Sequence, residues 1–292
     1  MTLPAATHTL MGILNLTPDS FSDGGQCLTS RDECKLDAVL AHAQWLIDHG
    51  CSVLDVGGES TRPGATTIPL DEELSRVVPV ITALRQHFPT ISISVDTRKA
   101  SVAKAAIDAG ASIVNDVSGL TYDPAMVQVV AYSQATLILM HSQGTPQTMQ
   151  QNPCYENVVR EVNDFLQRQT ESAIHHGVLE KNIVWDVGFG FGKTVEHNLQ
   201  LLSHLGEFTA CGFPVLLGTS RKSFLALRND MIPPLERDAL TAATLWHGAM
   251  AGCSWFRVHN PQVVQPVLAL VQAMQAQATR LSQRIMKEQA CV

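Results

Sequence analysis

Eight short runs of β-branched and other apolar residues recur along this 292-residue chain, separated by stretches in which apolar residues have helical spacing. The runs are Thr9 to Asn15, Ser52 to Val56, Ile91 to Asp96, Ser112 to Val117, Ala135 to His141, Ile183 to Val187, Pro214 to Gly218 and Ser254 to Val258. Strands that alternate with helices predict a parallel sheet covered by helices. Eight such units without a change in composition favour an α/β fold of the (β/α)8 TIM-barrel type, as a single domain over residues 1–292.

The helical stretches carry their own start and stop signals. The clearest one begins with capping-box spacing at Ser30 and ends at Gly50, directly before the second run. A last helix is predicted from about Pro261 towards Met286. Pro79 lies inside another apolar stripe, and we expect it to kink or split that helix because proline removes a backbone hydrogen bond.

Two connections are unusually long and rich in Gly, Pro, Ser and Asp: about 16–29 after the first run and about 57–69 after the second. Long loops in a compact fold are usually functional. Both follow strands, so both are predicted at the C-terminal mouth of the barrel, where this fold builds its active sites.

Composition narrows the class of protein. Hydrophobic residues make up 45% of the chain, which supplies a globular core, and the net charge of −7 argues against a nucleic-acid partner. No apolar run is long enough to span a membrane, and no basic residue precedes the first apolar run as in a signal peptide. The seven cysteines include no C-x-x-C pair, which predicts reduced thiols, a cytoplasmic location and core roles for Cys51 and Cys253.

Every predicted strand has a polar side chain at or just past its end. Any one of these residues could simply cap a helix or form a turn, but together they predict a polar ring at one mouth of the barrel. The ring consists of Asn15, Asp55 with Glu59, Asp96, Asn115 with Asp116, His141, Asp186, Lys222, and Arg257 with His259.

The ring divides into acceptors and cations, which suggests two subsites. A flat heterocycle that bears amino groups would be bound by the acceptors Asp96, Asn115 and Asp186. A diphosphate would be neutralised by the cations Arg62, Lys222, Arg257 and His259.

Two glycine-rich patterns do not match better-known motifs. The segment Gly188 to Lys193 lacks the glycine spacing of a dinucleotide-binding loop. Ser220 lacks the closing glycine of a nucleophile elbow, so we expect it to bind a ligand rather than attack one. His175 and His176 are predicted to end a helix and to have a structural role there.

Two long segments closely resemble signatures of the dihydropteroate synthases, a family of pterin-binding barrels. They are MGILNLTPDSFSDGG at 11–25 and DVGGESTRPG at 55–64. The resemblance continues in order to His259 through Ser94 to Thr97, Asn115 and Asp116, Leu139 to His141, Gly188 to Lys193, Ser220 to Ser223, and Arg257 to His259.

The resemblance implies an enzyme that joins p-aminobenzoate to 6-hydroxymethyl-7,8-dihydropterin diphosphate and releases diphosphate. The implied pterin ligands are Asp96, Asn115, Asp186 and Lys222. The implied diphosphate ligands are Asn15, Thr61, Arg257 and His259, with Asn15 also binding Mg²⁺. The implied p-aminobenzoate contacts are Thr61, Arg62, Pro63, Phe189, Ser220 and Lys222. The implied catalytic residues are Asp96, Lys222, Arg257 and His259.

The resemblance further implies a homodimer and two long loops that close over small-molecule substrates. A dissociative reaction is expected, because the pterin ring can carry a cation and no nucleophile–base pair is recognisable. Two positions depart from the family: Val187 stands where proline is usual, and Asn260 where aspartate is common. Two alternatives are a barrel that transfers a methyl group from a folate to a corrinoid protein, and a non-catalytic pterin-binding paralogue.

Overall fold

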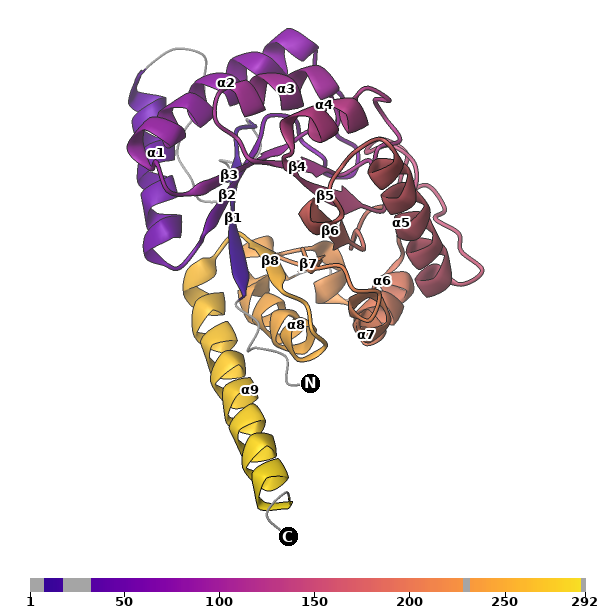
Figure 1. Ribbon diagram of the computed structural model, residues 1–292. Helices are drawn as coiled ribbons and strands as arrows, with labels where there is room; N and C mark the ends of the chain where they lie inside the picture. Colours follow the sequence, from indigo (N-terminus) through magenta and orange to yellow (C-terminus); the bar gives the residue numbers. More distant parts are fainter. Residues whose placement is uncertain (1–7, 18–32, 228–231, 290–292) are drawn as a thin grey trace.

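The computed structural model describes residues 8–17, 33–227 and 232–289. Within them, eight parallel strands pair in sequence order, and β8 pairs with β1 to close a barrel (Figure 1). The strands are β1 Thr9–Asn15, β2 Val53–Gly57, β3 Ser92–Asp96, β4 Ile113–Asp116, β5 Thr136–Met140, β6 Ile183–Asp186, β7 Val215–Leu217 and β8 Trp255–Val258. The predicted (β/α)8 barrel is confirmed, with each strand within two residues of its predicted bounds at either end.

Helices surround the barrel as its outer layer (Figure 1). They are α1 Glu33–Asp48, α2 Leu70–His87, α3 Ala100–Asp108, α4 Met126–Ser133, α5 Val158–His175, α6 Val195–Ser203, α7 Leu205–Thr209, α8 Asp238–Met250 and α9 Pro261–Gln289, with short 3-10 turns η2 Glu180–Asn182, η3 Ser223–Ala226 and η4 Pro234–Arg237. The far end of α9 extends beyond the barrel (Figure 1). None of the described helices is long and apolar enough to cross a bilayer.

Helix α2 runs unbroken past Pro79, so the predicted split of this helix is wrong. Proline frees the carbonyl four residues earlier, which here belongs to Ser75. Both Pro79 and Ser75 are exposed, so water can bond to that carbonyl without disturbing the buried face. The other helix predictions tested here hold: His175 ends α5 and α9 begins at Pro261. The predicted start at Ser30 lies outside the described residues.

The core has two parts, one on each side of the strands. The larger part lies between strands and helices and includes the buried Cys51 and Cys253, as predicted. The smaller part is a layer of side chains from the strands, with Trp255 packed against it: Met11, Val53, Ile113, Ile138, Val184 and Leu216. These six side chains form the apolar lower layer inside the barrel.

Candidate active site

A second, polar layer lies directly above the apolar lower layer. Successive side chains of a strand alternate between its two faces, so residues two positions further along also point into the barrel. From Val53, Ile113, Val184 and Trp255, that step leads to Asp55, Asn115, Asp186 and Arg257. Together with Asp96 at the end of β3, these five side chains form what we call the polar upper layer.

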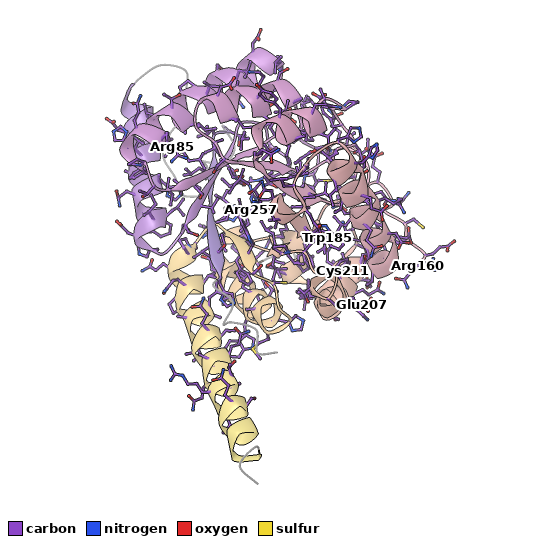
Figure 2. The ribbon with its side chains drawn as sticks, in the orientation of Figure 1. Arg85, Arg160, Trp185, Glu207, Cys211 and Arg257 are labelled. Atoms are coloured by element: carbon purple, nitrogen blue, oxygen red, sulfur yellow. The ribbon has the colours of Figure 1, made fainter. Side chains whose placement is uncertain are left out.

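Arg257 joins the carboxylates of this upper layer and lies within the ring of strands (Figure 2). Its Nε donates to Asp55 Oδ2 at 2.6 Å, and its Nη2 donates to Asp96 Oδ2 at 2.9 Å. Asn115 Nδ2 also donates to Asp55 Oδ2, at 3.2 Å. Asp55 is fully buried, so it anchors both Arg257 and Asn115. The sequence placed Asp55 in the polar ring but indicated no role for it.

Asp96 keeps one oxygen free of partners among the described residues. Its buried Oδ1 accepts no hydrogen bond there, although Oδ2 pairs with Arg257. Burial raises the pKa of Asp96 to about 7; Arg257 opposes this rise, while the nearby carboxylate of Asp55 adds to it. An unpartnered carboxylate oxygen of this kind is suited to bind an amino group of a heterocycle.

Lys222 and Asp186 form the other side of the site. Burial lowers the pKa of Lys222 to about 8, and Asp186 opposes the shift. The Lys222 ammonium donates to the carbonyl of Phe189 and lies 4.6 Å from the ring centroid of Phe191. Asp186 accepts a 2.8 Å hydrogen bond from the amide of Gly188, and burial raises its pKa. The site therefore holds an ammonium between a carbonyl and an aromatic face.

The resemblance implied Phe189 as a contact of p-aminobenzoate and gave no role to Phe191. Phe189 is fully buried in the core and stacks on Phe224, with ring centroids 5.8 Å apart. Phe191 instead lines the cavity of the site. The alternation of side chains along this glycine-rich segment does not reveal which ring faces inward, because the segment is not a strand.

His259 lies at the cation-rich side of the cavity. The Ser220 hydroxyl accepts from the backbone amide of His259 at 3.1 Å, and its oxygen lies 2.9 Å from Nδ1 of the same histidine, where the tautomer of the ring decides which atom donates. Burial lowers the pKa of His259 to about 3, and the charges of Arg257, Arg221 and Arg62 lower it further. His259 is therefore neutral at pH 7, and in the tautomer in which Ser220 donates to Nδ1, its Nε2–H is a donor for an anion.

The two departures from the family pattern do not remove any of these groups. Val187 is fully buried in the core, where an apolar residue fits. Asn260 donates to Asp238 Oδ2 at 2.7 Å, and Arg221 pairs with both oxygens of the same carboxylate at 2.7 and 2.9 Å. Asn260 thus supports an ion pair at the edge of the cavity without adding a charge there.

A cavity of about 940 Å³ connects most of these groups at the barrel mouth. The predicted site residues that line it are Asn15, Thr61, Arg62, Pro63, Asp96, Ser220, Lys222, Arg257 and His259. The predicted residues that do not line it are Asn115, Asp186 and Phe189, all of which are buried. The first long loop lies outside the described residues except for Leu16 and Thr17, which also line the cavity.

The second long loop is fastened at both ends by buried ion pairs that the sequence did not predict. Glu59 pairs with Arg98 at 2.5 Å and with Lys99 at 2.8 Å, and it accepts from the amide of Ile68 at 3.0 Å. Lys99 also donates to the Ile68 carbonyl at 2.9 Å and pairs with Glu73 at 2.6 Å. The start and end of the loop are therefore tied to the same lysine, while Thr61, Arg62 and Pro63 between them face the cavity.

A metal ion at this site would need ligands from the substrate as well as from the protein. No cluster of three or more His, Cys, Asp or Glu side chains suited to a metal occurs in the described part of the chain. A Cβ built on Gly57 would lie 3.5 Å from Asn15 Oδ1 and 3.6 Å from Asp96 Cβ, so the Asn15 oxygen borders the upper layer. One amide oxygen beside a cavity lined by Arg257 and His259 fits Mg²⁺ if a substrate phosphate binds there, because this ion commonly binds few protein groups together with substrate phosphates and water.

Comparison with known proteins agrees with this geometry. Residues 11–259 match the family model described as pterin binding enzyme. The dihydropteroate synthase of a Synechocystis species is 43% identical over 265 residues, which span 91% of this chain and 89% of that protein. The chain therefore belongs to the pterin-binding enzyme family and, within it, to the dihydropteroate synthases, which are transferases of folate biosynthesis.

Solved structures give the same result. A Yersinia pestis dihydropteroate synthase in complex with a sulfonamide drug superposes with a TM-score of 0.86 at 39% identity, covering 94% of this chain and 97% of the other. The Xanthomonas albilineans enzyme with 4-aminobenzoic acid has a TM-score of 0.84 at 39% identity, covering 94% and 95%. The sequence resemblance and the fold therefore lead to the same family.

Proposed function

We propose that this site joins p-aminobenzoate to 6-hydroxymethyl-7,8-dihydropterin diphosphate, giving 7,8-dihydropteroate and diphosphate. The observation that carries the proposal is a single cavity that extends from buried hydrogen-bond acceptors on the barrel axis to cations at the rim. A pterin and a diphosphate joined by one methylene need that combination of groups. A chain at 43% identity to a dihydropteroate synthase is expected to use it for the same reaction.

The pterin subsite in this proposal consists of Asp96, Asn115, Asp186 and Lys222. Asp96 offers its unpartnered Oδ1 to the amino-bearing edge of the ring. Asn115 and Asp186 lie just below the cavity wall as members of the upper layer, and they bound the deepest part of the subsite. Three groups that accept hydrogen bonds and one ammonium suit a ring that carries both donors and acceptors.

The diphosphate subsite consists of Asn15, Thr61, Arg257 and His259. Arg257 supplies a permanent charge, and neutral His259 offers its Nε2 proton to a phosphate oxygen. Mg²⁺, held by Asn15 and the substrate, would neutralise the leaving charge. The bound diphosphate is expected to raise the pKa of His259, because an anion favours the protonated ring.

The p-aminobenzoate subsite consists of Thr61, Arg62, Pro63, Ser220 and Lys222, with Phe191 in place of Phe189. The cavity lining supports this exchange of phenylalanines. The Xanthomonas albilineans relative, solved with 4-aminobenzoic acid, supports the class of ligand. Lys222 borders both organic substrates, so its loss is expected to weaken both.

The chemistry follows from the charges around the breaking C–O bond. Arg257 and His259 stabilise the negative charge that develops on the departing diphosphate, while the Asp96 carboxylate faces the positive charge that develops on the pterin. The amine of p-aminobenzoate then captures the cation. Asp96, Lys222, Arg257 and His259 are the catalytic residues of this dissociative mechanism, and no covalent bond to the enzyme is needed.

The order of these steps can be tested with ring-substituted aminobenzoates. If diphosphate leaves first, single-turnover rates at saturation should barely change with the basicity of the amine. A steep dependence on basicity would contradict the dissociative order, while the identity of the reaction would stand.

Formation of dihydropteroate is the test of the proposed function itself. The purified protein is mixed with the pterin diphosphate, p-aminobenzoate and Mg²⁺, and both dihydropteroate and diphosphate are measured. Equal amounts of the two products are expected. Pterin binding without turnover, or methyl transfer from a methylfolate to a corrinoid protein, would contradict the proposal and favour one of the alternatives.

We also propose that residues 1–292 form one domain that acts as a homodimer in the cytoplasm. Exposed apolar side chains on adjacent helices α8 and α9 support a second copy as a partner. They are Leu240, Met250, Val263, Leu270, Met274 and Leu281. Cys51, Cys154, Cys211 and Cys253 are unpaired thiols, which supports a reducing compartment.

A further inference from the structure

The glycine-rich segment Gly188 to Lys193 curls around the side-chain amino group of its last residue. Lys193 Nζ lies 2.9 Å from the carbonyl oxygen of Gly188 and 3.1 Å from that of Phe191. It also contacts the end of β5, at 2.9 Å from His141 Nδ1 and 3.3 Å from the His141 carbonyl oxygen. The Lys193 side chain is only 3% exposed. Each of these four acceptors is uncharged.

Burial lowers the pKa of the Lys193 amino group well below its usual value, and the charge of Asp186 opposes this shift. Carbonyl oxygens can only accept hydrogen bonds, and three of them surround Nζ, so the amino group is the donor to them. In this position the amino group holds the carbonyls of one loop together and against the end of the neighbouring strand.

The glycines explain how the backbone reaches Lys193. Gly188 and Gly192 have φ values of +70° and +63°, a backbone conformation that residues with a side chain rarely adopt. A Cβ on Gly188 would lie 1.8 Å from the His141 carbonyl oxygen, and a Cβ on Gly192 would lie 2.5 Å from the Gln143 carbonyl oxygen. The segment therefore packs backbone against backbone on the connection that follows β5.

The same segment carries both groups that hold the Lys222 ammonium. Phe189 accepts its hydrogen bond through the backbone carbonyl, and Phe191 lies beneath it through the ring. Both residues lie between Gly188 and Lys193, and the Lys193 amino group donates directly to the carbonyl of Phe191. The position of Lys222 in the cavity thus depends on a loop whose shape depends on Lys193.

We propose that Lys193 is a positioning residue: its buried amino group fixes the Gly188–Phe191 segment so that Phe191 and the Phe189 carbonyl hold Lys222 against p-aminobenzoate. This inference rests on the proposed function and adds a residue that does not itself line the cavity. Other polar side chains assist it, since Asn198 accepts from the Gly190 amide at 2.7 Å and Tyr155 donates to the Gly192 carbonyl at 2.8 Å. Neither of them contacts Phe191 or Phe189 through these bonds.

The test compares Lys193→Met, which keeps the length of the side chain, with Lys104→Met, a control on the exposed lysine of α3. For Lys193→Met, KM for p-aminobenzoate should rise about tenfold or more, while KM for the pterin diphosphate changes less, because Asp96 and Asn115 lie on other strands. Kinetic constants are expressed per folded enzyme, with the folded fraction taken from urea unfolding. Lys104→Met should match the wild type.

A second variant distinguishes the role of the Lys193 amino group from the packing of its methylene chain. Lys193→Ala leaves space for n-propylammonium, which should restore most of the lost affinity for p-aminobenzoate, whereas n-propanol of the same length should not. Wild-type constants in Lys193→Met would overturn the proposal. So would equal changes in both KM values, no rescue by the amine, or failure of both variants to fold, which would assign Lys193 to the fold alone. Absence of dihydropteroate from the wild-type protein would instead contradict the proposed function.

Discussion

The two layers of side chains inside the barrel come largely from the same strands but differ in what they contribute. The lower layer is apolar, and its burial stabilises the fold. The upper layer, two residues further along, holds charged and amide groups away from water, which opposes folding unless each group is paired. Asp55 and Asp96 each keep one buried oxygen without a partner within the described residues, and of these two carboxylates Asp96 is the one that lines the cavity. Side chains that stabilise the fold and side chains suited to chemistry therefore lie two residues apart along the same strands.

The largest effects on stability and on activity are expected from a substitution of Arg257, which pairs with Asp55 and Asp96. Arg257→Met leaves the buried carboxylates of Asp55 and Asp96 without their cation, which should lower the free energy of unfolding by about 3 kcal/mol or more. Activity should fall about a thousandfold, because a donor to the leaving group is also lost. Arg257→Lys is the control: it keeps the charge but cannot bridge two carboxylates, so intermediate losses are expected. Urea unfolding and steady-state kinetics measure both effects.

Asp96→Asn should affect activity alone. The amide keeps the acceptor for Arg257 but removes the negative charge that faces the pterin cation, so kcat/KM should fall about a hundredfold or more. Near-normal kinetics in a folded variant would show that the carboxylate has no catalytic role.

Ionisable groups of the site, Asp96 in the upper layer and Lys222 beside it, should also set the pH range over which the enzyme is active. Burial raises the pKa of Asp96 to about 7 and lowers that of Lys222 to about 8. The proposed mechanism needs an ionised Asp96 and a protonated Lys222, so kcat/KM should rise through about pH 7 and fall above about pH 8. In Asp96→Asn, the low residual kcat/KM should no longer rise through about pH 7, because the group that ionises there is absent. A flat profile from pH 6 to 9 would rule out both assignments.

The smallest effect on catalysis is expected from a substitution in the lower layer. Val184→Ala removes two methyl groups from a side chain that is 3% exposed, two residues before Asp186 on β6. The free energy of unfolding should drop by about 2 kcal/mol. The kinetic constants per folded molecule should stay within about twofold of the wild type. A large fall in kcat at full folding would show that the two layers are not separable.

The barrel could be predicted from the sequence because its strands and helices have distinct periods and each strand has a clear end. The ends of the strands also predicted most of the polar ring, since parallel strands deliver their last side chains to one mouth. Asp55 was placed in that ring, but its role as an anchor depends on the register that brings it against Arg257 from 202 positions away.

Other features depend on geometry that periodicity does not encode. Phe189 and Phe191 lie in a loop where left-handed glycines decide which ring faces the cavity, so the sequence does not show that Phe191, rather than the Phe189 implied by the resemblance, lines the cavity. The roles of Lys99 and Lys193 were not predicted, because Glu59 and His141, with which they form bonds, lie in distant segments. Pro79 was misjudged because exposure, which the sequence does not show, made its lost hydrogen bond harmless.

The free energy of unfolding of Asp96→Asn at pH 8 tests the separation of the two layers most directly. The folded-state pKa of Asp96 is raised, so any stability that this carboxyl contributes is present below its unfolded pKa and is lost as the pH rises through about 7. At pH 8 the wild type therefore carries a destabilising buried charge that the amide lacks. Urea unfolding should show Asp96→Asn to be at least as stable as the wild type while its activity is a hundredfold lower. A loss of stability as large as that of Val184→Ala would contradict the separation.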